Sequence, residues 1–452
     1  MYFEQIKTEG LGCYSYIIGC PTAGVMAVVD PRRQTDIYHK ISEEYEMRIT
    51  HIFDTHVHAD HISGAQQLHD ETGTDIYIHE SAPITYTAKR VKDGDEFTLG
   101  EAVIHVMHTP GHTHNSISLL VTDRARSDKP QMILTGDLLF VGDIGRPDLP
   151  GEEILDEQIH NLFDSLFVKL STLDDYIEVY PAHGQGSLCG SGMSSKSSST
   201  LGFERLSNTM LQHREFEEFK NAIMSNLPIR PQSFSGIIAA NLDKANILHC
   251  CCTDNSLTAK EVYGHLKDCT VLDLRDDLSF SGAHIPNSIH VDASSVAMLN
   301  WVGMAIAPGT PLVLVLPHGR SFEEIQLELQ RIGYDDVKGY LKGGIHAWIE
   351  EGYEVQPLKY ISATALRDYL SEHKPVIIDV RNLDEIRGMK IEGSVSVSFD
   401  DILSDDIGFD RSSEIIVVCQ SGYRASIAAS LLQAKGFTDV AVLIGGMFAW
   451  MK

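Results

Sequence analysis

Short apolar runs separated by polar turns fill the first part of the chain. Clear examples, brief and rich in β-branched side chains, are residues 17–18, 25–29, 49–53, 132–134 and 177–180. Such runs are typical of strands. Segments of helical length lie between or after them, at residues 34–47, 152–171 and 203–225. The alternation predicts an α/β domain over residues 1–250.

Residues 186–200 interrupt this pattern with a stretch rich in glycine and serine, which predicts a loop. Two interpretations of the loop stay open. It is either a flexible connector or a lid beside an active site, since a long loop in a compact domain is often functional.

The rest of the chain contains an internal repeat with a period near 100 residues. Residues 271–275, 329–337 and 343–348 match residues 377–381, 432–440 and 445–450, in the same order. Solenoid repeats are about 20–50 residues long, so this longer period indicates a duplicated domain. Each copy alternates short apolar strands with helices, which predicts two α/β domains with parallel sheets, at residues 251–356 and 357–452.

The composition and charge of the chain argue against several classes of function. The 452 residues carry a formal net charge of −27, which argues against a nucleic-acid partner. A local pocket on an acidic protein still accepts small anions. The chain has no run of about 18 apolar residues, and no basic segment followed by an apolar one near its start. We therefore expect no membrane span and no secretory signal, and a cytoplasmic protein.

The eight cysteines show no CxxC pair and no disulfide-framework spacing, so we expect reduced thiols. Cys250, Cys251 and Cys252 are adjacent. Neighbouring residues of a strand point to opposite faces, which favours structural thiols over a metal site there. Cys20 ends an apolar run, and its alternative role is that of a local thiol acceptor.

The strongest local pattern is the sequence THVHADH at residues 55–61, directly after an apolar run. It contains four candidate ligands: His56, His58, Asp60 and His61. Three further candidates, each placed where a short apolar run ends in a tight turn, are His112, Asp137 and His183. Imidazoles and carboxylates that converge at strand ends suit a first-row transition metal. The pattern predicts a metal site at one edge of a sheet sandwich.

These seven residues resemble the metallo-β-lactamase superfamily. The resemblance covers about residues 1–250 and implies an αββα sandwich with the metal at the sheet edge. His58 stands where the flavodiiron branch is expected to carry a glutamate, which disfavours that branch. Two branches stay open: dinuclear thioester hydrolases of the glyoxalase II type, and persulfide dioxygenases with one Fe(II).

For the dioxygenase branch, the resemblance implies His56, His112 and Asp137 as the iron ligands. The residues that then surround these ligands, or that hold a second metal in the hydrolase branch, are His58, Asp60, His61 and His183. The ligand set by itself does not separate the branches. Residues 145–148 resemble the GRxD stretch of the dioxygenases, which implies that Arg146 pairs with an anionic substrate.

A second candidate site follows the apolar run at residues 415–418. Cys419 begins a loop whose backbone N–H groups curl around its sulfur, and a helix starts just afterwards. This arrangement stabilises a thiolate. Arg424 adds a cation suited to an oxyanion. The loop residues expected to contact a substrate are Gln420, Ser421, Gly422 and Tyr423.

This loop resembles the rhodanese active-site loop, in which an arginine follows the catalytic cysteine after four residues. The flanking segments at 379–381 and 445–450 also fit the family, whereas Lys390 stands where it usually has a histidine. The first copy carries Leu316 at the position of Cys419. The resemblance therefore implies that the first copy is an inactive rhodanese domain, which serves as a spacer or docking surface.

The order of the three domains resembles persulfide dioxygenases fused to sulfurtransferases. The resemblance implies that a low-molecular-weight persulfide and O₂ react at one Fe(II) per chain to give sulfite and a thiol. Cys419 then passes a sulfane sulfur to sulfite, which leaves as thiosulfate. The expected partners are the persulfide, O₂ and sulfite. Large fusions of this kind often self-associate, so we expect a homo-oligomer. Two rivals are a dizinc thioesterase with sulfur-relay domains and a persulfide carrier that uses Cys419 alone.

Overall fold

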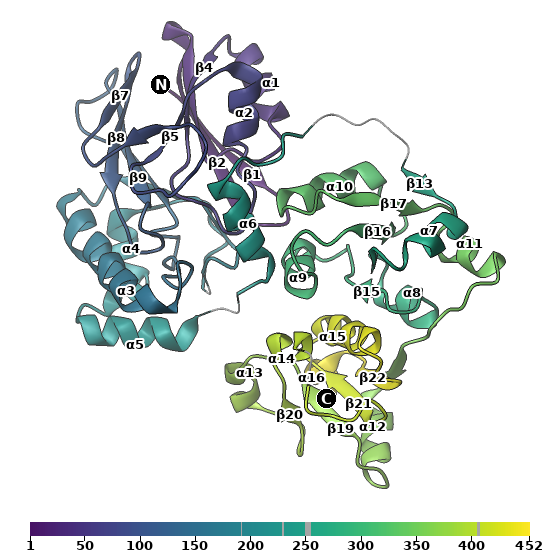
Figure 1. Ribbon diagram of the computed structural model, residues 1–452. Coiled ribbons are helices and arrows are strands. Elements are labelled where there is room, and N and C mark those ends of the chain that lie inside the picture. The colour runs from purple at the N-terminus through teal and green to yellow at the C-terminus, as the bar shows by residue number, and fades with distance from the viewer. Residues whose placement is uncertain (191, 228–229, 249–254, 405–406) are drawn as a thin grey trace. The chain divides into compact units, whose positions relative to one another are not determined.

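A computed structural model describes residues 1–452 apart from 191, 228–229, 249–254 and 405–406 (Figure 1). The chain forms two units, residues 1–251 with 330–333 and residues 252–329 with 334–452. Cys250, Cys251 and Cys252 lie outside the described residues, so their role stays a prediction. Among the helices described, none is both long enough and apolar enough to cross a membrane.

The apolar runs of the first unit form two sheets, each with six strands among the described residues. The first sheet has the order β1-β2-β3-β4-β5-β6 and the second the order β12-β11-β10-β9-β8-β7. Strands of the first sheet are β1 (Tyr2–Thr8), β2 (Cys13–Cys20), β3 (Val25–Val29), β4 (Arg48–Phe53), β5 (Ile76–His79) and β6 (Lys89–Val91). Strands of the second are β7 (Glu96–Leu99), β8 (Ala102–His108), β9 (Ile117–Asp123), β10 (Met132–Gly136), β11 (Glu178–Pro181) and β12 (Ser199–Thr200).

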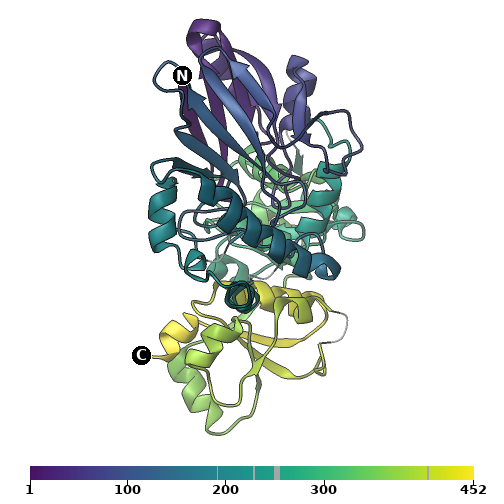
Figure 2. The ribbon, with the colours of Figure 1, turned by 90° about the vertical axis from the view of Figure 1, so that its left-hand side faces the viewer.

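The two sheets share one apolar core, and helices cover their outer faces, as Figures 1 and 2 show. Side chains from both sheets meet in this core, among them Tyr16, Phe53, Ile104 and Leu119. Helices α1 (Asp36–Glu44) and α2 (Ala65–Thr72) pack on the first sheet. Helices α3 (Leu155–Asp164) and α5 (Phe216–Asn226) pack on the second. The predicted αββα sandwich is confirmed.

The helix predicted over residues 203–225 is divided in the structure. Helix α4 (Leu201–Ser207) ends before Asn208, and α5 begins only at Phe216. The buried Asn208 adopts an extended backbone conformation, and its side-chain amide donates to the carbonyl of Asp143 and to Glu204. Asparagine commonly ends helices in this way, because its side chain competes for backbone hydrogen bonds. The other helical pieces of this unit are α6 (Ser233–Leu242), η1 (Pro21–Ala23), η2 (Glu152–Ile154), η3 (Ser165–Lys169), η4 (Leu170–Thr172) and η5 (Met210–Gln212).

The second unit contains two five-stranded sheets among its described residues, in which every neighbouring pair of strands is parallel. Their orders, β13-β17-β16-β14-β15 and β18-β22-β21-β19-β20, match position by position, as a duplication requires. The first copy has β13 (Ser256–Leu257), α7 (Ala259–His265), β14 (Thr270–Asp273), α8 (Asp277–Gly282), β15 (Ile289–His290), α9 (Met298–Ala305), β16 (Leu312–Val315), α10 (Phe322–Arg331), β17 (Val337–Leu341) and α11 (Gly344–Glu350). The second has β18 (Lys359–Ile361), α12 (Ala363–Leu370), β19 (Val376–Asp379), α13 (Leu383–Gly388), β20 (Val395–Ser396), α14 (Phe399–Leu403), β21 (Glu414–Val418), α15 (Tyr423–Ala434), β22 (Asp439–Leu443) and α16 (Gly446–Trp450).

Candidate metal centre and cysteine loop

The seven predicted ligand residues of the first unit lie on the loops that follow β4, β8, β10 and β11. All seven are buried: His56, His58, Asp60, His61, His112, Asp137 and His183. Asn241 of α6 holds the loop after β4 in place, because its side-chain amide donates to the carbonyls of His58 at 2.9 Å and His61 at 2.8 Å. The fold thus brings together side chains that are far apart in the sequence.

Three of the seven side chains face one another with unpaired atoms. His56 Nε2 lies 3.8 Å and His112 Nε2 3.4 Å from Asp137 Oδ2. None of these three buried atoms has a hydrogen-bond partner within the described part of the chain. A buried polar atom without a partner costs roughly 1–3 kcal/mol, so a shared metal ion accounts for all three at once. Two imidazoles and one carboxylate fit a first-row transition metal and leave coordination positions open.

Hydrogen bonds at the far ring nitrogens orient both imidazoles. His112 Nδ1 donates to the carbonyl of Arg146 at 2.8 Å. His56 Nδ1 lies 3.0 Å from the hydroxyl of Thr55, which donates its own proton to Asp30 at 2.8 Å and so accepts from the ring. In each ring Nε2 therefore keeps its lone pair for a metal.

The protonation states of the three side chains agree with roles as metal ligands. Burial holds the pKa of His56 well below its ordinary value and also lowers the pKa of His112. Burial works against an ionised Asp137, but His183 and His112 together hold the pKa of its carboxyl well below the usual range. Neutral imidazoles and an ionised carboxylate are the protonation states that bind metals.

His183 is held between two carboxylates. Its Nδ1 lies 2.6 Å from Asp137 Oδ1, and its Nε2 lies 2.7 Å from Asp60 Oδ2. Burial disfavours the charged ring, but the two carboxylates raise the pKa of His183 well above its ordinary value. Both nitrogens therefore donate, and in this state neither has a lone pair for a metal.

His58 and His61 also have carboxylate partners. His58 Nε2 donates to Asp30 at 3.1 Å, and although burial opposes the charge, Asp30 raises the pKa of this ring to about 9. His61 Nδ1 lies 3.1 Å from Asp60 Oδ1. A second metal at Asp60 would require His61 and His183 to exchange hydrogen bonds for coordination bonds, whereas Nδ1 of His58 has no hydrogen-bond partner among the described residues. One group that would permit this, with ligand atoms within 4.8 Å of one another, is Cys13, Asp60, His61 and His183.

The predicted cysteine loop lies in the second unit, at the carboxyl end of β21. Cys419 is buried, and the backbone N–H of Gly422 donates to its sulfur at 3.1 Å. Gly422 has a φ of 110°, a conformation that favours glycine. Helix α15 begins at the next residue, so its positive end faces the sulfur.

Other side chains of the loop have partners outside it. Both terminal nitrogens of Arg424 donate to the carboxylate of Glu385, at 2.8 and 2.6 Å. Burial acts against the charge, but Glu385 and Cys419 raise the pKa of Arg424, so the cation persists beside the sulfur. Gln420 accepts from Arg381 at 3.3 Å, and Ser421 lines a surface cavity with Phe448.

Comparison with known proteins identifies both parts of the chain. Residues 10–183 match the metallo-beta-lactamase superfamily, and residues 258–351 and 362–452 match the rhodanese-like domain. The hydroxyacylglutathione hydrolase of Francisella tularensis subsp. novicida is 31% identical over 184 residues, which cover 40% of this chain and 67% of that protein. This chain is a metallo-β-lactamase superfamily member with two rhodanese-like domains.

The solved structures that resemble it include a metallo-beta-lactamase and an ETHE1 protein. A metallo-beta-lactamase from Staphylococcus aureus subsp. aureus COL is 28% identical with a TM-score of 0.67, and the match covers 75% of this chain and 98% of that one. A structure of ETHE1 from Myxococcus xanthus is 31% identical with a TM-score of 0.46, and the match covers 53% of this chain and 98% of that one. The first match extends beyond the metallo-β-lactamase domain into the rhodanese-like part.

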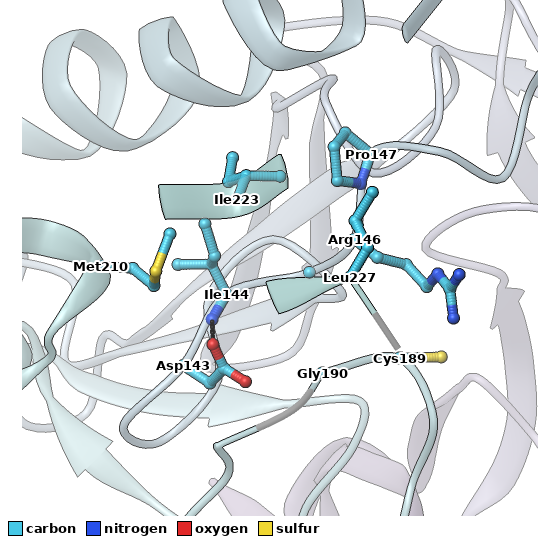
Figure 3. Close-up of a pocket in the computed structure, with 10 residues that line it drawn as sticks. Asp143, Ile144, Arg146, Pro147, Cys189, Gly190, Met210, Ile223 and Leu227 are labelled. Carbon is cyan, nitrogen blue, oxygen red and sulfur yellow. Dashed lines mark hydrogen bonds between the residues drawn. The ribbon is translucent and has the colours of Figure 1, made fainter. Parts of the chain in front are cut away.

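In the metallo-β-lactamase domain, Arg146 has partners other than a substrate. Its guanidinium is buried and donates to both oxygens of Asp148 at 2.7 Å. It also donates to the carbonyl of Leu188 at 3.2 Å, while its backbone N–H donates to the carbonyl of Cys189. Figure 3 shows Arg146 and Cys189 lining a pocket of about 30 Å³, room for about one water molecule. Arg146 thus ties the Gly/Ser-rich loop to the metal centre, where Cys189 lies within 4.8 Å of ligand atoms of Asp137 and His183.

Sequence reasoning missed Asp30, which hydrogen-bonds to His58 and, through Thr55, orients His56. Asp30 accepts from the backbone and hydroxyl of Thr55 and from His58. It directly follows the apolar strand β3, the same strand-end position that identified the other candidates. Cys20, by contrast, is buried at the end of β2 against Gly100 and belongs to none of the potential metal groups among the described residues.

We expect Gly145→Ala to weaken metal binding by about 10- to 100-fold. A Cβ at Gly145 would lie 1.8 Å from the carbonyl oxygen of Asp137 and 3.3 Å from His112 Nδ1, so both ligands must shift. Titration with metal followed by equilibrium dialysis measures the loss. Gly192→Ala is the control, because its new Cβ would meet Asp143 only at 3.7 Å. Equal affinity in both variants would contradict the packing argument.

The two rhodanese-like domains differ at the sulfur position. In the first, Leu316 follows β16 where Cys419 follows β21, so no thiol is available there. In the second, Lys390 stands where the rhodanese family usually has a histidine, and it is exposed.

Proposed function

We propose that the chain is a non-haem Fe(II) persulfide dioxygenase coupled to a thiosulfate-forming sulfurtransferase. The observation that carries this proposal is the set of three unpartnered atoms, His56 Nε2, His112 Nε2 and Asp137 Oδ2. Two histidines and one carboxylate with open positions are typical of Fe(II) oxygenases. Hydrogen bonds occupy both ring nitrogens of His183, which favours one metal over two.

The overall oxygenase reaction balances as RSSH + O₂ + H₂O → RSH + SO₃²⁻ + 2H⁺. Iron(II) held by His56, His112 and Asp137 would supply the redox chemistry that joins O₂ to the terminal sulfur. The protein fixes the ligand orientations through Thr55 and the carbonyl of Arg146. The persulfide, O₂ and sulfite are the proposed small-molecule partners of a cytoplasmic enzyme without nucleic-acid or membrane partners, and a homo-oligomer is the proposed state.

The second step takes place at Cys419. Its thiolate attacks the outer sulfur of a persulfide, forming a Cys419 persulfide and releasing the thiol. Sulfite then attacks that outer sulfur, the S–S bond breaks, and thiosulfate leaves with the Cys419 thiolate restored. The N–H of Gly422 stabilises negative charge on sulfur, and Arg424 supplies a cation for the sulfite anion. A tether between the two sites raises the effective concentration of sulfite.

A dinuclear thioester hydrolase is the alternative that specific observations favour. The 31% identical relative is a hydroxyacylglutathione hydrolase, and the group of Cys13, Asp60, His61 and His183 offers ligands for a second ion. In that case the rhodanese-like domains would relay sulfur independently of the hydrolase.

Metal content and oxygen uptake separate the two functions. For protein produced in iron-supplemented medium, we expect about one iron per chain and oxygen uptake on addition of glutathione persulfide. Inductively coupled plasma mass spectrometry and an oxygen electrode give both values on the same sample. Two zinc ions per chain, no uptake and hydrolysis of a glutathione thioester would establish the alternative instead.

A further inference from the structure

We propose that the first rhodanese-like copy, which lacks the thiol, positions the Cys419 loop of the second copy. This inference rests on the proposed sulfur-transfer role of Cys419. Both copies belong to one unit, and their contact falls on helix α15, the helix that starts at the cysteine loop.

Helix α15 is enclosed on all sides. Its residues from Ala425 to Gln433 are all buried, although a surface helix would expose one face. One side packs on β21 and β22 of its own sheet, and another packs on β15 of the first copy. There the backbone N–H of His290 donates to the buried hydroxyl of Ser430 at 3.0 Å.

Tyr423 links the first copy directly to the cysteine loop. Its hydroxyl lies 3.4 Å from the carbonyl of Asp292, and Trp301 of α9 meets its ring edge-on at 6.3 Å between centroids. Trp301 also contacts Phe399 at 4.9 Å, so its indole packs against two aromatic rings of the second copy. Tyr423 was expected to contact a substrate, but the structure directs it into the contact between the copies.

The position of Tyr423 explains why this contact matters for chemistry. It is the first residue of α15 and directly follows Gly422, whose N–H donates to the Cys419 sulfur. Any displacement of the Tyr423 ring therefore moves that donor and the positive end of the helix together. Arg424, the next residue, moves with them. Tyr423 is thus a positioning residue that acts through the backbone.

Polar groups support the same contact on the neighbouring turn of α15. The Ser426 hydroxyl is hydrogen-bonded to Tyr360. Burial raises the pKa of Asp277 of α8 in the first copy, while His290 and Ser426 act to lower it. Asp277 Oδ1 lies 3.7 Å from His290 Nδ1. The first copy thus contributes aromatic, backbone and carboxylate contacts to the helix start.

The test uses the full-length chain and measures alkylation of Cys419 by iodoacetamide as a function of pH, with mass spectrometry of the Cys419 peptide. We expect Tyr423→Phe and Trp301→Ala to slow alkylation at neutral pH by about three- to tenfold and to move its pH midpoint upward. Trp301→Phe should restore most of the rate. Trp348→Phe is the control, because Trp348 packs with Tyr263 and Tyr353 inside the first copy.

Unchanged alkylation profiles in both Tyr423→Phe and Trp301→Ala would overturn the inference. An equal slowing in Trp348→Phe would also overturn it, since the effect would then reflect general destabilisation. Tyr423→Phe removes a single oxygen atom and decides the matter if Trp301→Ala unfolds. The assay follows the thiol and needs no turnover, so a chain that makes no thiosulfate would refute the proposed function without refuting the positioning role.

Discussion

His112→Ala is expected to remove both the bound iron and the persulfide-dependent oxygen uptake. The substitution deletes one of three atoms that converge without other partners, and leaves the carbonyl of Arg146 without its donor. Loss of residues that merely orient metal ligands typically costs 10- to 100-fold, so loss of a ligand should exceed about 100-fold in uptake. Metal analysis of the dialysed protein and an oxygen electrode provide the measurements.

The matched control for this experiment is His105→Ala. His105 lies on the same strand β8, is about two-fifths exposed and pairs with the surface carboxylate of Glu96. The His105→Ala variant should retain its bound iron and its oxygen uptake. A His112→Ala protein that keeps one iron per chain and full uptake would show that the metal lies elsewhere, most directly at the group containing Cys13 and His61.

Cys419→Ser is expected to abolish thiosulfate formation while oxygen uptake continues. Sulfite should accumulate in place of thiosulfate, because serine cannot carry a sulfane sulfur. The buried sulfur at the start of α15 is the acceptor in our proposal, and the equivalent position of the first copy is Leu316. Ion chromatography of sulfite and thiosulfate, with the non-enzymatic background subtracted, gives the ratio of the two products.

Cys269→Ser serves as the control for thiol loss in general, since Cys269 is a half-buried free cysteine of the first copy. It should leave the product ratio unchanged. Thiosulfate formation by Cys419→Ser at the wild-type rate would refute the assignment of Cys419. Loss of oxygen uptake in the same variant would instead indicate a carrier in which Cys419 serves both reactions.

Strand-end positions explain why much of the fold and site was predictable. His112, Asp137 and His183 each follow a short apolar run, and parallel or neighbouring strands bring their ends to one edge. The repeat likewise predicted two parallel sheets, because equal sequence patterns produce equal strand orders. These features depend on local sequence alone.

The remaining features depend on partners that local sequence does not identify. Arg146 lies within the stretch predicted to contact a substrate, and its guanidinium donates to Asp148 and to the carbonyl of Leu188, 42 residues away. Tyr423 was predicted to contact a substrate, and Trp301 of the other copy packs edge-on against its ring. The predicted helix over 203–225 ends early because Asn208 finds the carbonyl of Asp143. In each case the deciding partner comes from another part of the fold.

The hydrogen bonds of Asp30 bear on whether a fold of this kind holds one metal or two. The carboxylate orients His56 through Thr55 and pairs with Nε2 of His58, while Nδ1 of His58 has no partner among the described residues. Under the proposed function, the same seven side chains would suit one metal or two, depending on how this carboxylate orients the two rings. Oxygenases and hydrolases built on these residues would then share one ligand motif, and their ancestors would be indistinguishable by that motif.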